Sequence, residues 1–308
     1  LHLSIRRQRQ MCIRDSLKFI KSKTNAQVLA VVKADAYGHG LLPVARAAQD
    51  AGADWLGTAL LEEAITLRNG GITKPIIAWL TPMGEDFKTA INLDIDLSIS
   101  STELLNEIVL AGKSVKKIPR VHIEVDTGMS RGGVGDDWQI FLKELSISAK
   151  NNEINIVGIW SHFARADEPD EGMNKEQLNV FEDRIKSATA AGIKAEFIHI
   201  ANSAASLTSK AAHKSIIRWG IGLYGLSPDI NNLGDSKSLY LKPAMRLKAK
   251  LHLVKAVKAG VSVGYGGTAA AKSDTKLGVV TLGYADGIPR NANNLAGVFV
   301  AGMRAPLI

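Results

Sequence analysis

The feature that most constrains the fold is a regular alternation of short apolar runs with longer helical patterns. The runs lie at 28–32, 54–59, 75–80, 95–100, 120–126, 154–160, 195–200 and 215–220. The segments between them have helical composition, and several end in Ala-Gly, a common helix stop. Alternating strands and helices form parallel sheets, and eight repeats in about 200 residues predict a (β/α)8 barrel of the TIM type. An open, doubly wound sheet is the alternative.

The pattern changes after about residue 228. Segment 227–238, "SPDINNLGDSKS", is typical of a linker, and the following text alternates with a period of two or is rich in glycine. We therefore expect the barrel over 17–230 and a mostly β domain over 238–308. That domain stops on the strand-like run "VFVAGMRAPLI", so we expect it to be incomplete and the chain to be a fragment.

Segment 1–16, "LHLSIRRQRQMCIRDS", differs from the rest of the chain. It shows no clear helical or strand period, and it contains the only cysteine, Cys12. A targeting peptide would need an apolar stretch or a long amphipathic helix. We expect this segment to be a foreign-looking or disordered tail outside the fold.

Composition excludes several classes of function. The net charge of +8 owes much to four arginines in segment 1–16, and the other basic residues are scattered, which argues against nucleic-acid binding. No apolar run approaches the roughly 20 residues of a membrane span. A single cysteine forbids an internal disulfide and fits a reducing, cytoplasmic location. We expect no metal site.

Unusual polar or glycine-rich segments follow several of the apolar runs. Lys33 follows the first run directly. The segments after the last four runs are "DTGMSRGG", "SHFARADE", "ANSAAS" and "GIGLYG". In (β/α)8 barrels the chemistry sits at the C-terminal ends of the strands, with phosphate often held after strands 7 and 8. The sequence therefore places a candidate active site at one rim.

Lys33 is the candidate nucleophile, because an amine at a strand tip is partly desolvated and its pKa falls. A solvated lysine is the alternative for an isolated residue. Tyr37, Ser203 and the backbone amides of Gly220 and Ile221 can hold a phosphate. Asn202 and Ser203 also suit a helix N-cap, which is compatible with phosphate at that helix start. A nucleophilic lysine facing a phosphate site suggests pyridoxal 5′-phosphate.

From Ser16 to Ile308 the chain resembles the alanine racemases, barrel-type pyridoxal-phosphate enzymes. The resemblance rests on "AVVKADAYGHG", "VDTGMSR", "SHFA", "HIANSAAS", "RWGIGLYG", "SVGYGGT" and "LGYADGIPR", in that order. It implies that Lys33 binds the cofactor, and that Tyr37, Asn202, Ser203, Gly220 and Ile221 hold its phosphate. It places Arg218 at the pyridine nitrogen, His162 and His199 in the hydrogen-bonded network behind the ring, and Arg131 near the substrate carboxylate.

The resemblance also implies a reaction. Tyr265 matches the second base of a two-base interconversion of L- and D-alanine, and in the family a homodimer supplies it from the partner subunit. Tyr284 and Arg290 resemble residues that line the access to the site. The implied role is bacterial: D-alanine for cell-wall peptidoglycan.

Three departures from the family stand out. Glu124 replaces an often carbamylated lysine, the loop reads "RGG" where arginine, an apolar residue and glycine are usual, and a Met-Asp loop, a late tyrosine and the usual first strand are missing. The alternatives are a serine or broad-specificity racemase, an inactive fragment, or a non-catalytic cofactor-binding barrel. Proteins of the last kind lack the β domain, so residues 238–308 argue against it.

Overall fold

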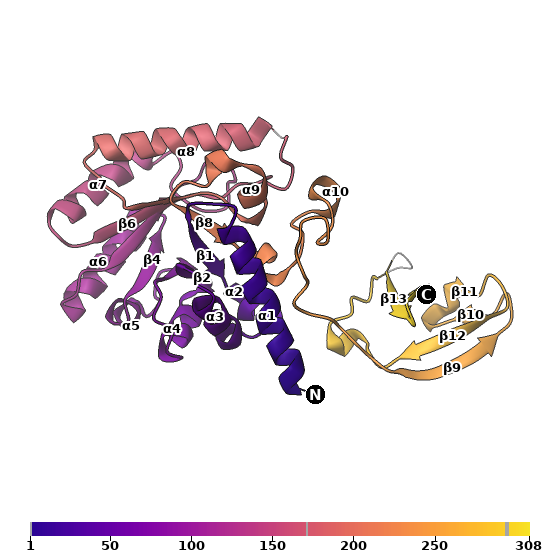
Figure 1. Cartoon of the computed structure of the whole chain (residues 1–308). Coiled ribbons are helices and arrows are strands. Elements are labelled where there is room, and N and C mark those ends of the chain that lie inside the picture. Colours follow the sequence, from indigo (N-terminus) through magenta and orange to yellow (C-terminus); the bar gives the residue numbers. More distant parts are fainter. Residues whose placement is uncertain (1, 171, 293–295) are drawn as a thin grey trace. The chain divides into compact units, whose positions relative to one another are not determined.

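The computed structural model describes residues 2–170, 172–292 and 296–308. The chain divides into two compact units, Leu1–Met245 and Arg246–Ile308, drawn in Figure 1 from indigo to orange and from orange to yellow. We expected the second domain to begin near residue 238, and the division falls a few residues later. Each unit is described by itself.

The first unit is built around an eight-stranded sheet whose paired neighbours run parallel, in the order β7-β6-β5-β4-β3-β2-β1-β8. Its strands are β1 (Gln27–Val31), β2 (Trp55–Leu60), β3 (Ile76–Leu80), β4 (Ile95–Ile99), β5 (Arg120–Glu124), β6 (Asn155–Trp160), β7 (Phe197–His199) and β8 (Ile216–Trp219). The ends of the order meet where Ser215 N donates to Ile198 O (3.1 Å) and Arg218 N donates to Ala201 O (3.0 Å). The predicted barrel is confirmed, and the open sheet is excluded.

Helices follow the strands, as the alternation predicted. They are α2 (Lys33–Gly38), α3 (Leu41–Asp50), α4 (Leu61–Asn69), α5 (Phe87–Asn92), α6 (Thr102–Val115), α7 (Trp138–Lys150), α8 (Gly172–Ala190), α9 (Ser203–Thr208) and α10 (Ile230–Leu233), with short 3-10 turns η1 (Lys210–Ala212) and η2 (Ile221–Tyr224). Local chemistry sets their starts. Ser101, for example, accepts a hydrogen bond from Leu104 N (3.2 Å) at the start of α6, the usual N-cap arrangement.

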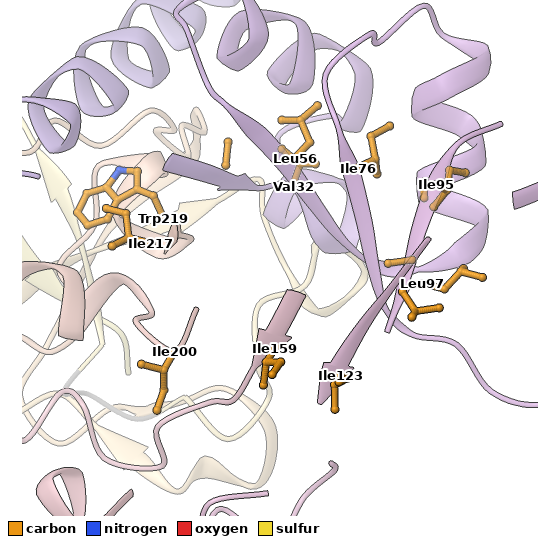
Figure 2. Packing of buried hydrophobic residues seen from close by; sticks show 14 of the residues in the cluster. Val32, Leu56, Ile76, Ile95, Leu97, Ile123, Ile159, Ile200, Ile217 and Trp219 are labelled. Atoms are coloured by element: carbon orange, nitrogen blue, oxygen red, sulfur yellow. The ribbon is translucent and has the colours of Figure 1, made fainter. Parts of the chain in front are cut away.

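The strands bury both faces, which explains why they read as continuous apolar runs. On β1, Val28 and Ala30 pack with the helices in the large outer cluster. Figure 2 draws part of that cluster. Leu29 and Val31 alternate with them and join a smaller cluster with Trp55 inside the barrel. The period of two therefore separates an outer apolar layer from the barrel interior.

Strand β5 lines the interior with polar side chains instead. Val121 and Ile123 belong to the outer cluster, so Arg120, His122 and Glu124 alternate with them on the other face. This polar face runs along β5 to its C-terminal end, where the candidate active site begins.

The N-terminal helix α1 (His2–Lys21) corrects one expectation. Ile13, Leu17 and Ile20 are at most 1% exposed and belong to the large core cluster. Ser16 Oγ accepts a hydrogen bond from Trp219 Nε1 (2.9 Å). For residues 2–16 the expected disordered tail is wrong, because they belong to a helix whose apolar side chains from Ile13 onward pack on the barrel.

The second unit is mostly β, as predicted. Strand β9 (Leu251–Val257) pairs antiparallel with β12 (Thr275–Val280). Two shorter antiparallel pairs join β10 (Ser262–Val263) to β11 (Ala269–Ala270) and β13 (Gly297–Val300) to β14 (Met303–Pro306). The 3-10 turns η3 (Tyr265–Gly267) and η4 (Tyr284–Asp286) lie between strands. Across the described parts of both units, none of the helices combines the length and apolarity needed to cross a membrane.

Candidate active site

Lys33 begins a turn with an unusual backbone. The next four residues, Ala34 to Tyr37, have φ values of 54°, 51°, 55° and 52°. This left-handed region costs L-residues roughly 1–2 kcal/mol each, so the surroundings must hold the turn in place. Glu63 Oε1 accepts a hydrogen bond from Asp35 N (3.2 Å), and Asp35 Oδ1 accepts one from Leu41 N (2.7 Å). Strain of this kind concentrates at functional sites.

The environment of Lys33 lowers the pKa of its amine. Partial burial is the main cause, and the positive charges of Arg131 and Arg218 add to it, while Glu63 acts in the opposite direction. This is the direction expected from the position of Lys33 at a strand tip. A lowered pKa increases the fraction of neutral, nucleophilic amine at neutral pH.

Tyr37, Ser203 and Gly220 converge beside this turn. Ser203 Oγ accepts hydrogen bonds from Gly220 N (2.9 Å) and Gly222 N (3.3 Å). A Cβ on Gly220 would lie 3.3 Å from Tyr37 Oη and 3.7 Å from Ser203 Oγ, so glycine leaves open the space between the two hydroxyls. Ile221 follows as the first residue of η2. These hydroxyl and amide groups suit an anion.

Asn202 is the N-cap of α9, the alternative that its sequence context indicated. Its Oδ1 accepts a hydrogen bond from Ala205 N (3.0 Å), and its carbonyl accepts one from Ser206 N (2.8 Å). The cap orients the start of α9, where Ser203 is the first helical residue. Asn202 therefore positions Ser203 whatever else it binds.

Arg218 is 3% exposed, and both of its terminal amino groups make hydrogen bonds. Its Nη2 donates to Ser161 O (2.7 Å) and Ile200 O (3.0 Å) and lies 3.0 Å from His162 Nδ1. Its Nη1 donates to His199 O (3.1 Å) and lies 3.3 Å from His199 Nδ1. Burial lowers the pKa of Arg218 to about 9, so the guanidinium remains charged at neutral pH.

His162 and His199 are both neutral at neutral pH. Burial lowers the pKa of each ring well below its ordinary value, and the charge of Arg218 adds to the effect. For His162, Arg131 and Lys33 contribute as well. A guanidinium can only donate, so a hydrogen bond from Arg218 to either ring requires an unprotonated Nδ1 atom.

Two of the departures from the family lie in contact. A Cβ on Gly132 would be 3.2 Å from Glu124 Oε1, so glycine leaves room for this carboxylate. Burial raises the pKa of Glu124 to about 7, while Arg131 and Arg218 oppose the rise and Asp126 adds to it. Gly133 folds back on the chain: its φ is +98°, and a Cβ there would meet Asp126 N at 2.5 Å. The two glycines of "RGG" therefore provide the space and the backbone turn that accommodate the Glu124 side chain.

Sequence reasoning missed a supporting residue, Gln177 of α8. Its Nε2 donates to Thr127 Oγ1 and to His162 O, both at 3.1 Å, and its Oε1 accepts from Ala164 N (2.9 Å). Gln177 is 1% exposed and connects the loops after β5 and β6. Nothing in its local sequence marks it, because an amide in a helix is usually solvated.

The structure brings the barrel candidates together at the C-terminal rim: Lys33, Tyr37, Arg131, His162, His199, Asn202, Ser203, Arg218, Gly220 and Ile221. Tyr265, Tyr284 and Arg290 belong to the second unit. Tyr265 is 89% exposed and opens the turn η3 between two glycines. The roles of these three residues stay predictions.

Fold and site define a (β/α)8-barrel enzyme with a lysine of lowered pKa, an anion cradle and a buried arginine at one rim. The family model "Alanine racemase, N-terminal domain" matches residues 11–228, and "Alanine racemase, C-terminal domain" matches residues 244–308. The chain belongs to the alanine racemase family of isomerases.

Similar proteins and solved structures support the same family assignment. The chain is 42% identical over 293 residues to the alanine racemase of Salinispora arenicola, covering 95% of this chain and 77% of the relative. The crystal structure of alanine racemase from D-cycloserine producing Streptomyces lavendulae has a TM-score of 0.93 at 40% identity, covering 96% of this chain and 78% of that one. The Bacillus anthracis alanine racemase with bound L-Ala-P has a TM-score of 0.84 at 31% identity, covering 96% and 76%.

Proposed function

We propose that this chain carries out the pyridoxal-phosphate-dependent interconversion of L-alanine and D-alanine by a two-base mechanism. The observation that carries the proposal is the convergence, at one barrel rim, of Lys33 with the Tyr37–Ser203–Gly220 cradle and the buried Arg218. The relative with bound L-Ala-P supports alanine as the substrate.

The residues of the rim fit this cofactor. The cradle offers two hydroxyls around a space that a side chain at Gly220 would fill, and such a space can hold a phosphate group. Ser203 and Tyr37 would hold the phosphate, and Lys33 would bond the carbonyl carbon. When bound, pyridoxal phosphate supplies an electron-withdrawing system that stabilises negative charge at the substrate Cα.

The stereochemistry of racemisation requires two bases. Racemisation removes a proton from one face of Cα and delivers one to the other, and a single side chain cannot easily serve both faces. Lys33 Nζ serves one face, helped by its lowered pKa. Tyr265 serves the other. In the family it comes from the partner subunit, so we propose that the active unit is a homodimer.

Arg218 and Arg131 have separate roles in this proposal. Arg218 would donate to the pyridine nitrogen, which must then remain an unprotonated acceptor because guanidinium has no acceptor of its own. Such a ring withdraws electrons less, which limits side reactions of a long-lived carbanion. Arg131 would bind the substrate carboxylate. D-alanine made in this way would supply cell-wall peptidoglycan.

The experiment is reconstitution of the purified protein with pyridoxal 5′-phosphate, followed by borohydride reduction and peptide mapping. We expect a visible absorption band and a cofactor-modified peptide that contains Lys33. Modification at another lysine contradicts the assignment. Comparing kcat/KM for alanine and serine then separates an alanine racemase from a serine or broad-specificity enzyme.

A further inference from the structure

A line of polar contacts crosses the barrel interior behind the candidate site. Asp96 of β4, His122 of β5, His199 of β7 and Arg218 of β8 are each at most 3% exposed. Asp96 Oδ2 lies 3.1 Å from His122 Nε2, and His122 Nδ1 lies 3.1 Å from His199 Nε2. His199 Nδ1 lies 3.3 Å from Arg218 Nη1. We call these four residues the interior chain.

The two ends of the interior chain determine where its protons sit. Arg218 can only donate, so His199 Nδ1 accepts. A neutral His199 then carries its proton on Nε2 and donates it to His122 Nδ1. His122 Nδ1 therefore accepts, so His122 carries its proton on Nε2 and donates it to Asp96. An ionised carboxylate can only accept, so both ends require the same arrangement.

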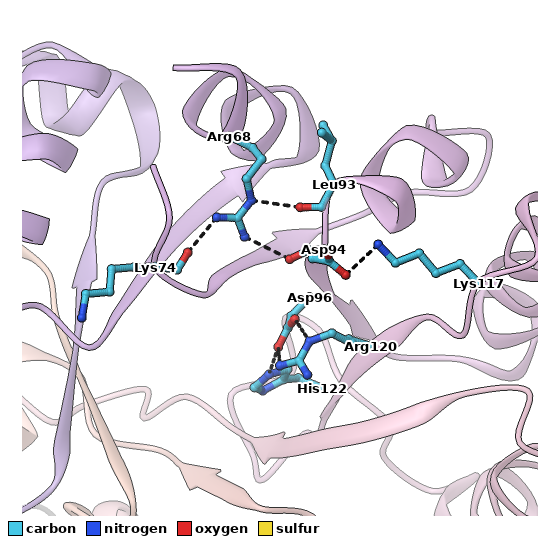
Figure 3. A network of polar contacts seen from close by, with 8 residues as sticks. All are labelled: Arg68, Lys74, Leu93, Asp94, Asp96, Lys117, Arg120 and His122. Carbon is cyan, nitrogen blue, oxygen red and sulfur yellow. Dashed lines mark hydrogen bonds and ion pairs between the residues drawn. The ribbon is translucent and has the colours of Figure 1, made fainter. Parts of the chain in front are cut away.

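The carboxylate end is held ionised. Arg120 Nε donates to Asp96 Oδ1 (2.6 Å) and Nη2 donates to Oδ2 (3.0 Å), as Figure 3 shows beside His122. Burial alone raises the pKa of Asp96, but the hydrogen bonds from His122 and Arg120 outweigh it and lower the pKa. Asp96 therefore keeps its charge inside the barrel.

Packing fixes the histidine rings in this line. The Trp55 ring meets His122 edge-on, with ring centroids 5.5 Å apart, and the Trp160 ring stacks on His199 at 6.1 Å. A Cβ on Gly158 would be 2.3 Å from His122 Nδ1, so the ring fits only because residue 158 is glycine. The rings cannot turn freely to offer other atoms.

We propose that Asp96 and His122 are positioning residues that hold His199 as its Nε2–H tautomer and thereby orient Arg218. The importance of this orientation for the reaction rests on the function proposed above for Arg218. If His199 carried its proton on Nδ1, two donors would face each other at 3.3 Å, and the guanidinium would have to turn away.

The first test uses the protein without cofactor, labelled with 15N-histidine. Two-bond 1H–15N NMR correlations identify the tautomer of each imidazole, and His→Gln variants assign the signals. We expect the Nε2–H tautomer at both His122 and His199 at neutral pH. An Nδ1–H tautomer or an imidazolium at either residue overturns the proposal.

The second test compares Asp96→Ala with Asp96→Asn. Alanine removes the terminal acceptor and leaves Arg218 as the one end of the line that still favours the Nε2–H form, so part of the His199 population should shift to the Nδ1–H form. Asparagine keeps one oxygen, and it should face His122, because the Oδ2 position meets two donors and the Oδ1 position one. Asparagine should therefore preserve the tautomer. The control Thr81→Ala deletes a buried hydroxyl that donates to Ser98 O and should leave the signals unchanged.

Loading with pyridoxal 5′-phosphate separates this proposal from the proposed function. The visible absorption maximum should shift in Asp96→Ala and stay in place in Asp96→Asn and Thr81→Ala. An unchanged His199 tautomer in a folded Asp96→Ala protein overturns the positioning role, even when the cofactor band forms. The unsubstituted protein could show the expected tautomers and yet form no cofactor band. That result contradicts the proposed function and still supports the positioning role of the interior chain.

Discussion

Glu124→Gln tests how much the buried carboxylate of Glu124 lowers the stability of the folded protein when it ionises. Glu124 has its pKa raised to about 7, mainly by burial, and its carboxylate lies against Gly132. Glutamine has nearly the same shape but no charge. The substitution therefore removes the cost of ionising residue 124 in the folded state without opening a cavity.

The direction of the stability change follows from the difference between the folded and unfolded pKa values of Glu124. The unfolded glutamate ionises near its ordinary pKa of 4.5, whereas the folded one keeps its proton to about pH 7. The wild-type protein thus loses stability as pH rises from about 4.5 to 7, and the glutamine variant does not. At about 1.36 kcal/mol per pH unit, the variant should be more stable by up to about 3 kcal/mol above pH 7. The difference should nearly vanish at acid pH.

The assay is urea denaturation of both proteins at several pH values between 5 and 8. Glu176→Gln, an exposed position on α8, is the control and should show no such pH-dependent gain. Equal stability of wild type and Glu124→Gln at pH 8, or a gain that shrinks as pH rises, refutes the reasoning.

The same variant tests a catalytic role. We expect ionised Glu124 to anchor Arg131 in place of the family's carbamate, so activity should need no bicarbonate. Glu124→Gln should then raise the KM for alanine at pH 8. An unchanged KM identifies Glu124 as a bystander, and a strong bicarbonate requirement refutes the replacement.

Tyr265→Phe should lower racemisation by about 10²–10⁴-fold, while solvent deuterium exchange at Cα persists better from D-alanine than from L-alanine; equal exchange by NMR contradicts the two-base assignment. Ser203→Ala removes the hydroxyl that bonds two glycine amides and should weaken cofactor binding by on the order of tenfold. Ser206→Ala in the same helix should not, and equal titration curves refute the cradle. Ile13→Ala should cost about 2–5 kcal/mol of unfolding free energy, because this side chain is 1% exposed. The exposed Met11→Ala should change it by less than about 0.5 kcal/mol, and similar urea midpoints for both contradict the packing of α1.

The barrel was predictable because each strand is a local apolar run between helical patterns. Helix α1 was not, because three apolar side chains spaced along an arginine-rich segment become significant only when a barrel surface is there to cover them. The alternation in "RVHIEVD" was enough to predict that His122 and Glu124 lie on one face of their strand. The alternation in "IDLSIS" likewise separates Asp96 from the apolar face of its strand.

By itself the sequence determined the eight strands, the mostly β second unit and the rim at which Lys33, Ser203 and Arg218 meet, since a strand's period and the side on which its loop emerges are local properties. Only the tertiary structure decided the contacts between distant segments. His122 meets His199 across 77 positions of the chain. Gly132 makes room for Glu124, and α1 docks beside Trp219. Such pairings depend on how strands close into a barrel, and the donor, acceptor and burial of each group exist only once that closure brings them together.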